Sequence, residues 1–231
     1  EIAPVFRAEH HDTSRHLNEY ISMDFEMGFI DSFEDIMNME TGALKYIMNL
    51  LKTEYANEVA LLHADIPEIT EIPTIRFMDA KEVIMKQFKY QPTDMKDFDP
   101  AEEEMLGKYA KKKFNSDFIF VTHYPSKKRP FYTMDDPEDP EYTLSFDLLF
   151  RGLEITSGGQ RVHDYNEQVE KMKRLGMDPE QFDTYLMLHK YGAPPHGGLG
   201  IGLERLTMHL LGFKNVREAA MFPRDINRVT P

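Results

Sequence analysis

The chain has 231 residues, a net charge of −13 at pH 7, 41% hydrophobic residues and no cysteine. This length and apolar content suit one or two globular domains with a buried core. The missing cysteines exclude disulfides and cysteine-ligated metal sites, and the acidic charge excludes a protein that binds nucleic acid over a broadly basic surface. No segment has the composition of a membrane span or a signal peptide, so we expect a cytoplasmic protein.

The first quarter of the chain predicts two strands and a helix. Residues 2–7 and 21–29 are rich in apolar and β-branched side chains, and the polar segment HHDTSRHLN joins them. Residues 32–55 have apolar side chains at helical spacing, with Asp31 or Ser32 as the expected N-cap. Because the chain opens inside an apolar alternation, EIAPVFRAE, we expect it to be part of a longer protein.

The middle of the chain, about 56–141, contains many prolines and short apolar segments. We interpret it as a subdomain inserted between core segments at about 1–55 and 142–231. Inside it, 81–88 and 101–114 predict surface helices and 118–124 predicts a strand. The acidic runs 102–104 and 135–141 and the basic run 127–129 are interpreted as solvated surface.

The last third returns to regular structure. Residues 142–159 predict strands that end in a glycine pair, and 164–175 and 179–190 predict helices. A glycine-rich loop follows, and then a helix at about 203–211. Antiparallel strands mixed with helices, without β-α-β alternation, favour the α+β fold class.

The glycine-rich segment PPHGGLGIGLERL, residues 194–206, places four glycines in front of a helix. Its spacing matches neither the dinucleotide-binding fingerprint nor the Gly-Lys-Ser/Thr phosphate loop. Taken alone, it is equally typical of a tight packing turn. Arg205, one turn into the helix, can clamp a terminal phosphate with paired donors, while the glycines give a flat base access to the backbone. The combination predicts a nucleotide site.

Residues 6–27, FRAEHHDTSRHLNEYISMDFEM, resemble the second signature motif of the class II aminoacyl-tRNA synthetases. Residues 197–206, GGLGIGLERL, resemble the third motif, and MFPRD at 221–225 fits the C-terminal end of this family. The likeness covers the whole chain and is greatest to the aspartyl type of archaea and eukaryotes. It implies a class II antiparallel β-sheet flanked by helices, incomplete on the N-terminal side, with motif one and the anticodon-binding domain before residue 1.

The resemblance implies an enzyme that activates L-aspartate with ATP to aspartyl-adenylate and transfers it to the 3′ end of tRNA(Asp). It gives catalytic roles to Arg7, at the α-phosphate and the substrate carboxylate, and to Arg205, at the γ-phosphate. The other implied ATP-binding residues are Glu9, Arg15, His16, Leu17, Glu154 and Gly202. The implied ligands of Mg²⁺ are Glu154 and Ser157, with Asp147 as a third candidate whose alternative is a carboxylate facing solvent.

The implied aspartate-binding residues are Arg7, Ser157, Arg161 and His196. Arg161 would read the side-chain carboxylate, His196 ranks below it, and His163 is left open. For the basic run 127–129, contact with the tRNA acceptor end is an alternative to the preferred solvated turn. The family also implies a homodimer for the full-length protein, and tRNA(Asn) as a second acceptor is left open.

Four alternatives to an aspartate enzyme differ in how well this sequence fits them. Asparaginyl enzymes differ at Asp24-Phe25 and at 157–159, where this chain follows the aspartyl pattern, and a lysyl enzyme is disfavoured because Arg161 would repel lysine. A non-translational relative that makes an amino acid or amide stays open. A binding module without activity also stays open, although the intact Arg7, Glu154 and Arg205 argue against it.

Overall fold

A seven-stranded sheet forms the centre of the computed structural model, which describes residues 1–230. The strand order is β1-β2-β7-β6-β5-β4-β3, and every neighbouring pair is antiparallel except the parallel pair β3 and β4. The strands are β1 (Ile2–Phe6), β2 (Glu19–Gly28), β3 (Thr74–Arg76), β4 (Phe118–Thr122), β5 (Ser145–Phe150), β6 (Leu153–Gln160) and β7 (His196–Gly202). The expected α+β class is confirmed.

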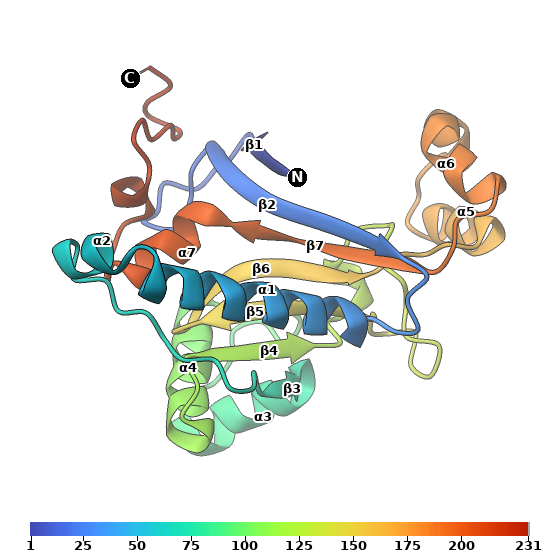
Figure 1. Ribbon diagram of the computed structural model, residues 1–231. Helices are drawn as coiled ribbons and strands as arrows, with labels where there is room; N and C mark the ends of the chain where they lie inside the picture. The colour runs from blue at the N-terminus through green and yellow to red at the C-terminus, as the bar shows by residue number, and fades with distance from the viewer. Residues whose placement is uncertain (231) are drawn as a thin grey trace.

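Two helical layers cover the sheet unequally (Figure 1). The helices are α1 (Glu34–Thr53), α2 (Ala56–Leu61), α3 (Phe77–Phe88), α4 (Pro100–Phe114), α5 (Tyr165–Arg174), α6 (Asp183–Lys190) and α7 (Leu203–Leu210). Helix α1 packs Ile36 and Leu44 onto one face, against Phe146, Leu148 and other side chains of β4 to β7. Helices α3 and α4 pack on the other face, mainly over β4 and β5, and α4 also contacts β6. The part of that face over β2 and β7 has no helix of this layer packed on it.

The predicted cap of α1 is wrong in detail. The N-cap residue is Phe33, whose side chain makes no capping hydrogen bond. Instead, the Asp35 carboxylate accepts hydrogen bonds from the backbone N–H groups of Asp31 and Ser32. An acidic residue in the first turn thus satisfies the donors that precede the helix, in place of a side chain at the N-cap.

The interval 56–141 contributes to the same sheet, although it was expected as an inserted subdomain. Its strand β4 pairs along its length with β5, and β3 extends the sheet by one further strand. The expected surface helices α3 and α4 bury Ile84, Leu106 and the whole Lys81 side chain. The interval is integrated because all five residues of β4 are buried, and four of them are apolar; the fifth is Thr122.

The glycine-rich segment 196–202 is a strand rather than a loop. It is β7, held between β2 and β6. Glycine is unfavourable in strands unless another backbone approaches closely. Here a Cβ atom at Gly198 would lie 2.2 Å from the Phe25 carbonyl oxygen, and one at Gly197 would lie 2.7 Å from the Gly159 oxygen. The glycines thus allow two neighbouring strands to approach, and α7 begins directly after β7 as expected.

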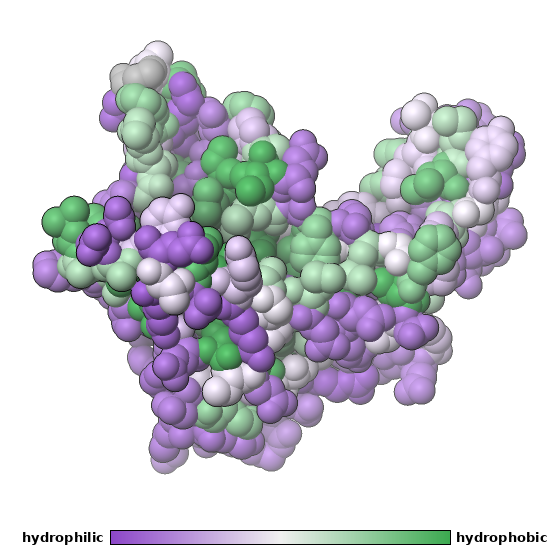
Figure 2. Space-filling view, in the orientation of Figure 1, coloured by the Kyte–Doolittle hydropathy of each residue, from purple (hydrophilic) through white to green (hydrophobic). Residues whose placement is uncertain are grey.

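The surface is mostly hydrophilic over α3 and α4, and the α5–α6 pair stands away from β1 and β2 across a hollow (Figure 2). None of the helices in the described part of the chain combines the length and apolar character that crossing a membrane requires.

Candidate active site

A cavity of about 820 Å³ occupies the face of the sheet that α3 and α4 leave uncovered. It brings together residues that are up to 215 positions apart in the sequence, from Glu1 to Val216, and Arg7 and Arg205 are among them. Ten of the twelve residues expected in the site line it: Arg7, Glu9, Arg15, His16, Leu17, Glu154, Ser157, Arg161, Gly202 and Arg205. Asp147 and His196 do not line it.

One end of the cavity is formed by the connection between β1 and β2. Strand β1 ends at Phe6, so Arg7 and Glu9 lie just beyond it, although the Arg7 N–H still bonds the Asn18 carbonyl at 2.8 Å. The Glu9 carboxylate accepts hydrogen bonds from the backbone N–H groups of His10 and His11. These bonds form a tight turn that places Arg7 and Glu9 at the entrance to the polar connection.

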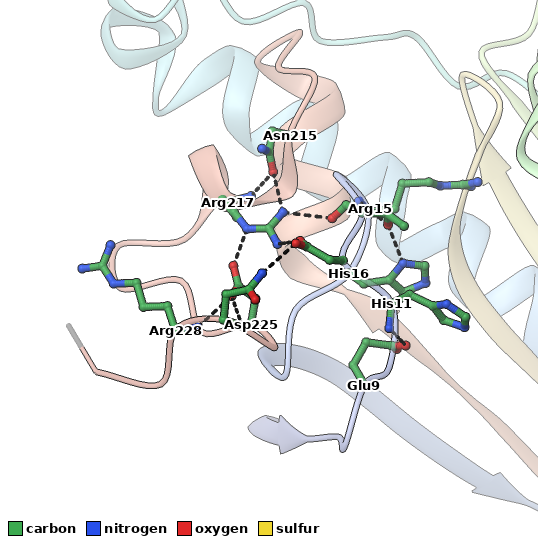
Figure 3. Close-up of polar contacts among 11 residues, drawn as sticks. Glu9, His11, Arg15, His16, Asn215, Arg217, Asp225 and Arg228 are labelled. Carbon is green, nitrogen blue, oxygen red and sulfur yellow. Dashed lines mark hydrogen bonds and ion pairs between the residues drawn. The ribbon is translucent and has the colours of Figure 1, made fainter.

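The C-terminal segment holds this connection in place (Figure 3). The Arg217 guanidinium donates to Asp225 at 2.6 Å, to Asp12 at 2.9 Å and to the Thr13 carbonyl at 2.9 Å. The Val216 N–H also bonds the Ser14 carbonyl at 2.8 Å. A planar guanidinium with several donors suits this junction. The loop that carries Arg15 and His16 is therefore fixed by residues from the opposite end of the chain.

Arg205 lies opposite this loop, in the first turn of α7. Its Nη1 donates to the Glu154 carbonyl at 2.8 Å and lies 3.7 Å from the Glu154 carboxylate. Burial, and then the nearby Arg205 charge, lower the pKa of His16, which favours its neutral ring. Leu17 fills the space behind the loop together with Leu153, Met208 and Val216. Three guanidinium groups, those of Arg7, Arg15 and Arg205, thus line this side of the cavity and can bind an anionic ligand.

Glu154, Ser157 and Asp147 form the oxygen-rich part of the site. About a third of the Glu154 side chain (35%) is exposed, and Glu154 lines the cavity. Desolvation by the surrounding protein, followed by repulsion from Asp147, raises the pKa of Glu154 to about 7. The Ser157 hydroxyl donates to Asp147. The alternative of an Asp147 that faces solvent is wrong, because its side chain is only 9% exposed in the middle of β5.

Oxygen donors are the ligand type that Mg²⁺ prefers, and this part of the site has two carboxylates and one hydroxyl. Within residues 1–230, however, no three histidine, cysteine, aspartate or glutamate side chains are arranged to hold a metal ion. Mg²⁺ is commonly bound by one or two carboxylates, with water and substrate phosphates completing its shell. A divalent cation would also neutralise the repulsion between Glu154 and Asp147.

Two arginines lie at the other end of the cavity, where the aspartate side chain was expected. Arg161 donates to the Glu26 carboxylate at 2.6 and 3.1 Å, and its N–H bonds the His196 carbonyl. Arg129 was missed, because it was interpreted as part of a solvated basic turn. Its side chain is only 13% exposed and lines the cavity, whereas Lys127 and Lys128 are exposed as expected.

Three groups position Arg129. Asp147 pairs with its Nη2 at 2.7 Å, Ser157 accepts from Nη1 at 3.3 Å, and the Tyr124 ring lies 3.9 Å from the guanidinium carbon. Its Nε is buried with no hydrogen-bond partner within the described residues. A buried donor without a partner is costly, so the Arg129 guanidinium is held here by its other contacts. The one sequence signal was the neighbouring apolar run PFY.

Neither His196 nor His163 lines the cavity. The His196 ring bonds the Pro194 carbonyl at 2.9 Å. Only the main-chain carbonyl of His196 is linked to the site, because it accepts a hydrogen bond from the backbone N–H of Arg161. The Nδ1 atom of His163 is buried without a partner in the described structure, and His163 does not line the cavity.

Comparison with known proteins agrees with this geometry. The family described as tRNA synthetases class II (D, K and N) matches residues 1–226. Aspartate--tRNA(Asp/Asn) ligase of Thermus thermophilus is 51% identical over 232 residues, covering all of this chain and 54% of the relative. The chain therefore spans about half the length of such a relative.

Solved structures give the same family. The aspartyl tRNA synthetase from Entamoeba histolytica superposes with a TM-score of 0.92 at 34% identity, over 100% of this chain and 48% of the other. The asparaginyl-tRNA synthetase from Pyrococcus horikoshii, complexed with asparaginyl-adenylate, has a TM-score of 0.88 at 32% identity, over 100% and 53% of the two chains. The lower identity of the asparaginyl protein, compared with the 51% of the aspartate ligase, does not favour the asparagine alternative.

Proposed function

Since this chain belongs to the class II tRNA synthetases of the D, K and N group, we propose that it carries the catalytic site of an aspartate--tRNA ligase. The observation that carries the proposal is the single cavity that gathers Arg7, Arg15 and Arg205 at one end and Arg129 and Arg161 at the other. A triphosphate and an amino acid with an anionic side chain need cationic groups in these two places.

In the proposed reaction, a carboxylate oxygen of aspartate attacks the α-phosphorus of ATP, and the bond to pyrophosphate breaks. Phosphoryl-type displacement depends mainly on positioning and on charge stabilisation. Arg7 holds the α-phosphate and the attacking carboxylate, while Arg15, His16 and Arg205 hold the outer phosphates. Glu9 accepts from the adenine amino group, and Gly202, where a Cβ would have no contact closer than 3.7 Å, leaves room for the nucleotide.

Glu154 and Ser157, with Asp147, are proposed to hold Mg²⁺ that enters with ATP. Bound there, the ion supplies positive charge to the phosphates. Arg161 and Arg129 are proposed to bind the side-chain carboxylate of aspartate. Both are paired with carboxylates in the structure, Arg161 with Glu26 and Arg129 with Asp147. These pairs fix the two guanidinium groups before the substrate arrives.

In the second step, a hydroxyl at the 3′ end of tRNA(Asp) attacks the aspartyl carbonyl of the adenylate, the acyl–phosphate bond breaks, and AMP leaves. The printed name of the Thermus thermophilus relative includes tRNA(Asn), which supports tRNA(Asn) as a second acceptor. We also propose a homodimer in the cytoplasm, as the resemblance implies for the full-length protein.

Amino-acid-dependent ATP–pyrophosphate exchange tests the proposal directly. The complete protein should exchange pyrophosphate with aspartate and not with asparagine. Exchange with asparagine alone would show that the interpretation of Asp24 and of 157–159 is wrong. No exchange with either amino acid would favour a relative with another reaction or a module that only binds. Charging of transcribed tRNA(Asp) and tRNA(Asn) then measures the choice of acceptor.

A further inference from the structure

Besides Glu154 and Asp147, a further carboxylate, that of Glu103 on helix α4, reaches the end of the cavity that Arg15 and Arg205 line. Its side chain is 12% exposed and forms an ion pair with Arg15. The next residue, Glu104, is 63% exposed and pairs with Lys108 along the helix surface. The acidic run 102–104 is therefore not a uniform solvated face, because Glu102 is also buried, in an ion pair with Lys81.

Two glycines explain how α4 reaches the site. A Cβ atom at Gly107 would lie 2.5 Å from the Gly152 nitrogen, and one at Gly152 would lie 2.7 Å from the Glu104 Cα. Gly152 also has a φ of +81°, which favours glycine. The N-terminal half of α4 thus lies directly against the turn between β5 and β6. Since Glu154 follows this turn, Glu103 is brought to the start of β6.

Glu103 is also connected, through Glu154, to Arg205. Its Oε2 accepts from Arg15 and from the Glu154 N–H at 3.3 Å. The Glu154 carbonyl accepts in turn from Arg205. The main chain of one residue therefore joins the carboxylate that holds Arg15 to the guanidinium of Arg205. The Nε and Nη1 atoms of Arg15 make no hydrogen bond within residues 1–230, so donors remain for a ligand.

We propose that Glu103 is a positioning residue for the ATP clamp: it holds Arg15 by one end of its guanidinium and ties it to Glu154, so that Arg15 and Arg205 are placed before the outer phosphates arrive. This inference rests on the proposed function. A long arginine side chain loses conformational freedom when it binds a phosphate, and fixing it beforehand removes part of that loss. The contact persists in the ground state and the transition state alike, so it acts on KM for ATP rather than on kcat.

The direction in which KM for ATP changes distinguishes this proposal from a simple charge effect. A carboxylate close to a triphosphate repels it, so a Glu103 that acted by charge alone would weaken ATP binding, and its removal would lower KM for ATP. A Glu103 that positions Arg15 strengthens ATP binding, and its removal raises KM for ATP. Glu103→Ala removes both the charge and the contact, whereas Glu103→Gln removes the charge and keeps an oxygen that can accept a hydrogen bond.

The experiment measures ATP–pyrophosphate exchange by the complete protein, with Glu103→Ala, Glu103→Gln and Glu104→Ala as the matched control. Loss of a charge-assisted hydrogen bond predicts a rise in KM for ATP of about tenfold or more in Glu103→Ala. We expect kcat and KM for aspartate to stay within about threefold, which a general structural defect would not allow. Glu103→Gln should lie between Glu103→Ala and the wild type, and Glu104→Ala should match the wild type.

A double variant makes the test specific to Arg15. If Glu103 acts through Arg15, adding Glu103→Ala to Arg15→Ala should change KM for ATP by less than about twofold. An unchanged or lowered KM for ATP in Glu103→Ala would overturn the proposal, and so would a full additional loss in the double variant. If the wild type shows no exchange with aspartate, the proposed function fails instead, and equilibrium binding of ATP to the wild type and Glu103→Ala still tests Glu103.

Discussion

Adding one methyl group at Gly198 should destabilise the protein far more than adding it at Gly202, although both glycines belong to β7. A Cβ at Gly198 would lie 2.2 Å from the Phe25 carbonyl oxygen and 2.3 Å from the Glu26 Cδ. The first of these atoms belongs to the backbone of β2, which is paired with β7 along seven residues, so it cannot rotate away as a side chain can. At Gly202 the nearest atom is 3.7 Å away, an ordinary contact distance.

The magnitudes follow from packing. Forcing extra volume into a packed site costs about 1–3 kcal/mol, and a backbone obstacle places Gly198→Ala near 3 kcal/mol on this scale. In a chain of this size, 1 kcal/mol changes Tm by about 2–4 °C, so the expected loss is roughly 6–12 °C. Gly202 has an ordinary φ of −73° at the N-cap of α7. Replacing it by alanine weakens the cap and restricts the unfolded chain, which leaves a net change within about 1 kcal/mol.

Thermal unfolding followed by circular dichroism measures both variants, and ATP–pyrophosphate exchange adds a second readout. Gly202→Ala should change Tm by less than about 4 °C but raise KM for ATP, because the methyl group enters space that we assign to the nucleotide. Similar losses of Tm in the two variants would refute the argument that Gly198 is required for strand packing whereas Gly202 is not. A Gly198→Ala loss below about 2 °C would refute the packing estimate itself.

Three further changes test the site and the core. Arg205→Ala should slow aspartate-dependent exchange by about 10²–10³ because it removes one preorganised charge at the transition state; a near-normal rate would contradict its role, and Arg174→Ala on the surface of α5 is the control. Arg161→Leu should abolish exchange with aspartate while equilibrium binding of ATP is kept, and equal loss of ATP binding would show that Arg161 does not read the side chain. Burial raises the pKa of Glu40 from 4.5 to about 8, so the folded state keeps a proton that the unfolded state releases. Wild-type stability should therefore fall by up to about 1.4 kcal/mol per pH unit between these values. Urea unfolding of Glu40→Gln should show a shallower fall, and equal slopes would contradict the assignment.

Most helices and strands could be predicted from the sequence, because the spacing of their apolar residues reflects which face of each element is buried. The alternating residues of β1 and β2 and the helical spacing of α1 predicted these elements to within a few residues. The glycine segment could not be recognised as a strand, because glycine has a low strand propensity and its reason for being there lies in other strands. Only the positions of β2 and β6 show that a side chain at Gly198 has no room.

The candidate site divides in the same way. Residues in the two long motifs, such as Arg7 and Arg205, were predicted and line one cavity. Arg129 and Glu103 were not, because each stands in a run of like charges whose members have different surroundings. Arg129 turns inward onto Tyr124 and Asp147, and Glu103 turns inward onto Arg15. Burial of a charge in such a run depends on its partners from distant segments, which a single sequence does not reveal.

The hydrogen bonds from Arg217 and Asn227 to the connection between β1 and β2 also affect when that connection can form. Arg217 and Thr13 are 204 residues apart, and Asn227 and Asp12 are 215 residues apart. Contacts of such separation close late, because the intervening chain must be ordered first. At about 5–20 residues per second, a ribosome needs roughly 10–40 s to progress from Thr13 to Arg217. During this time the loop proposed to bind ATP lacks its anchor, so a nascent chain completes its nucleotide site only after Arg217 and Asn227 have left the ribosome.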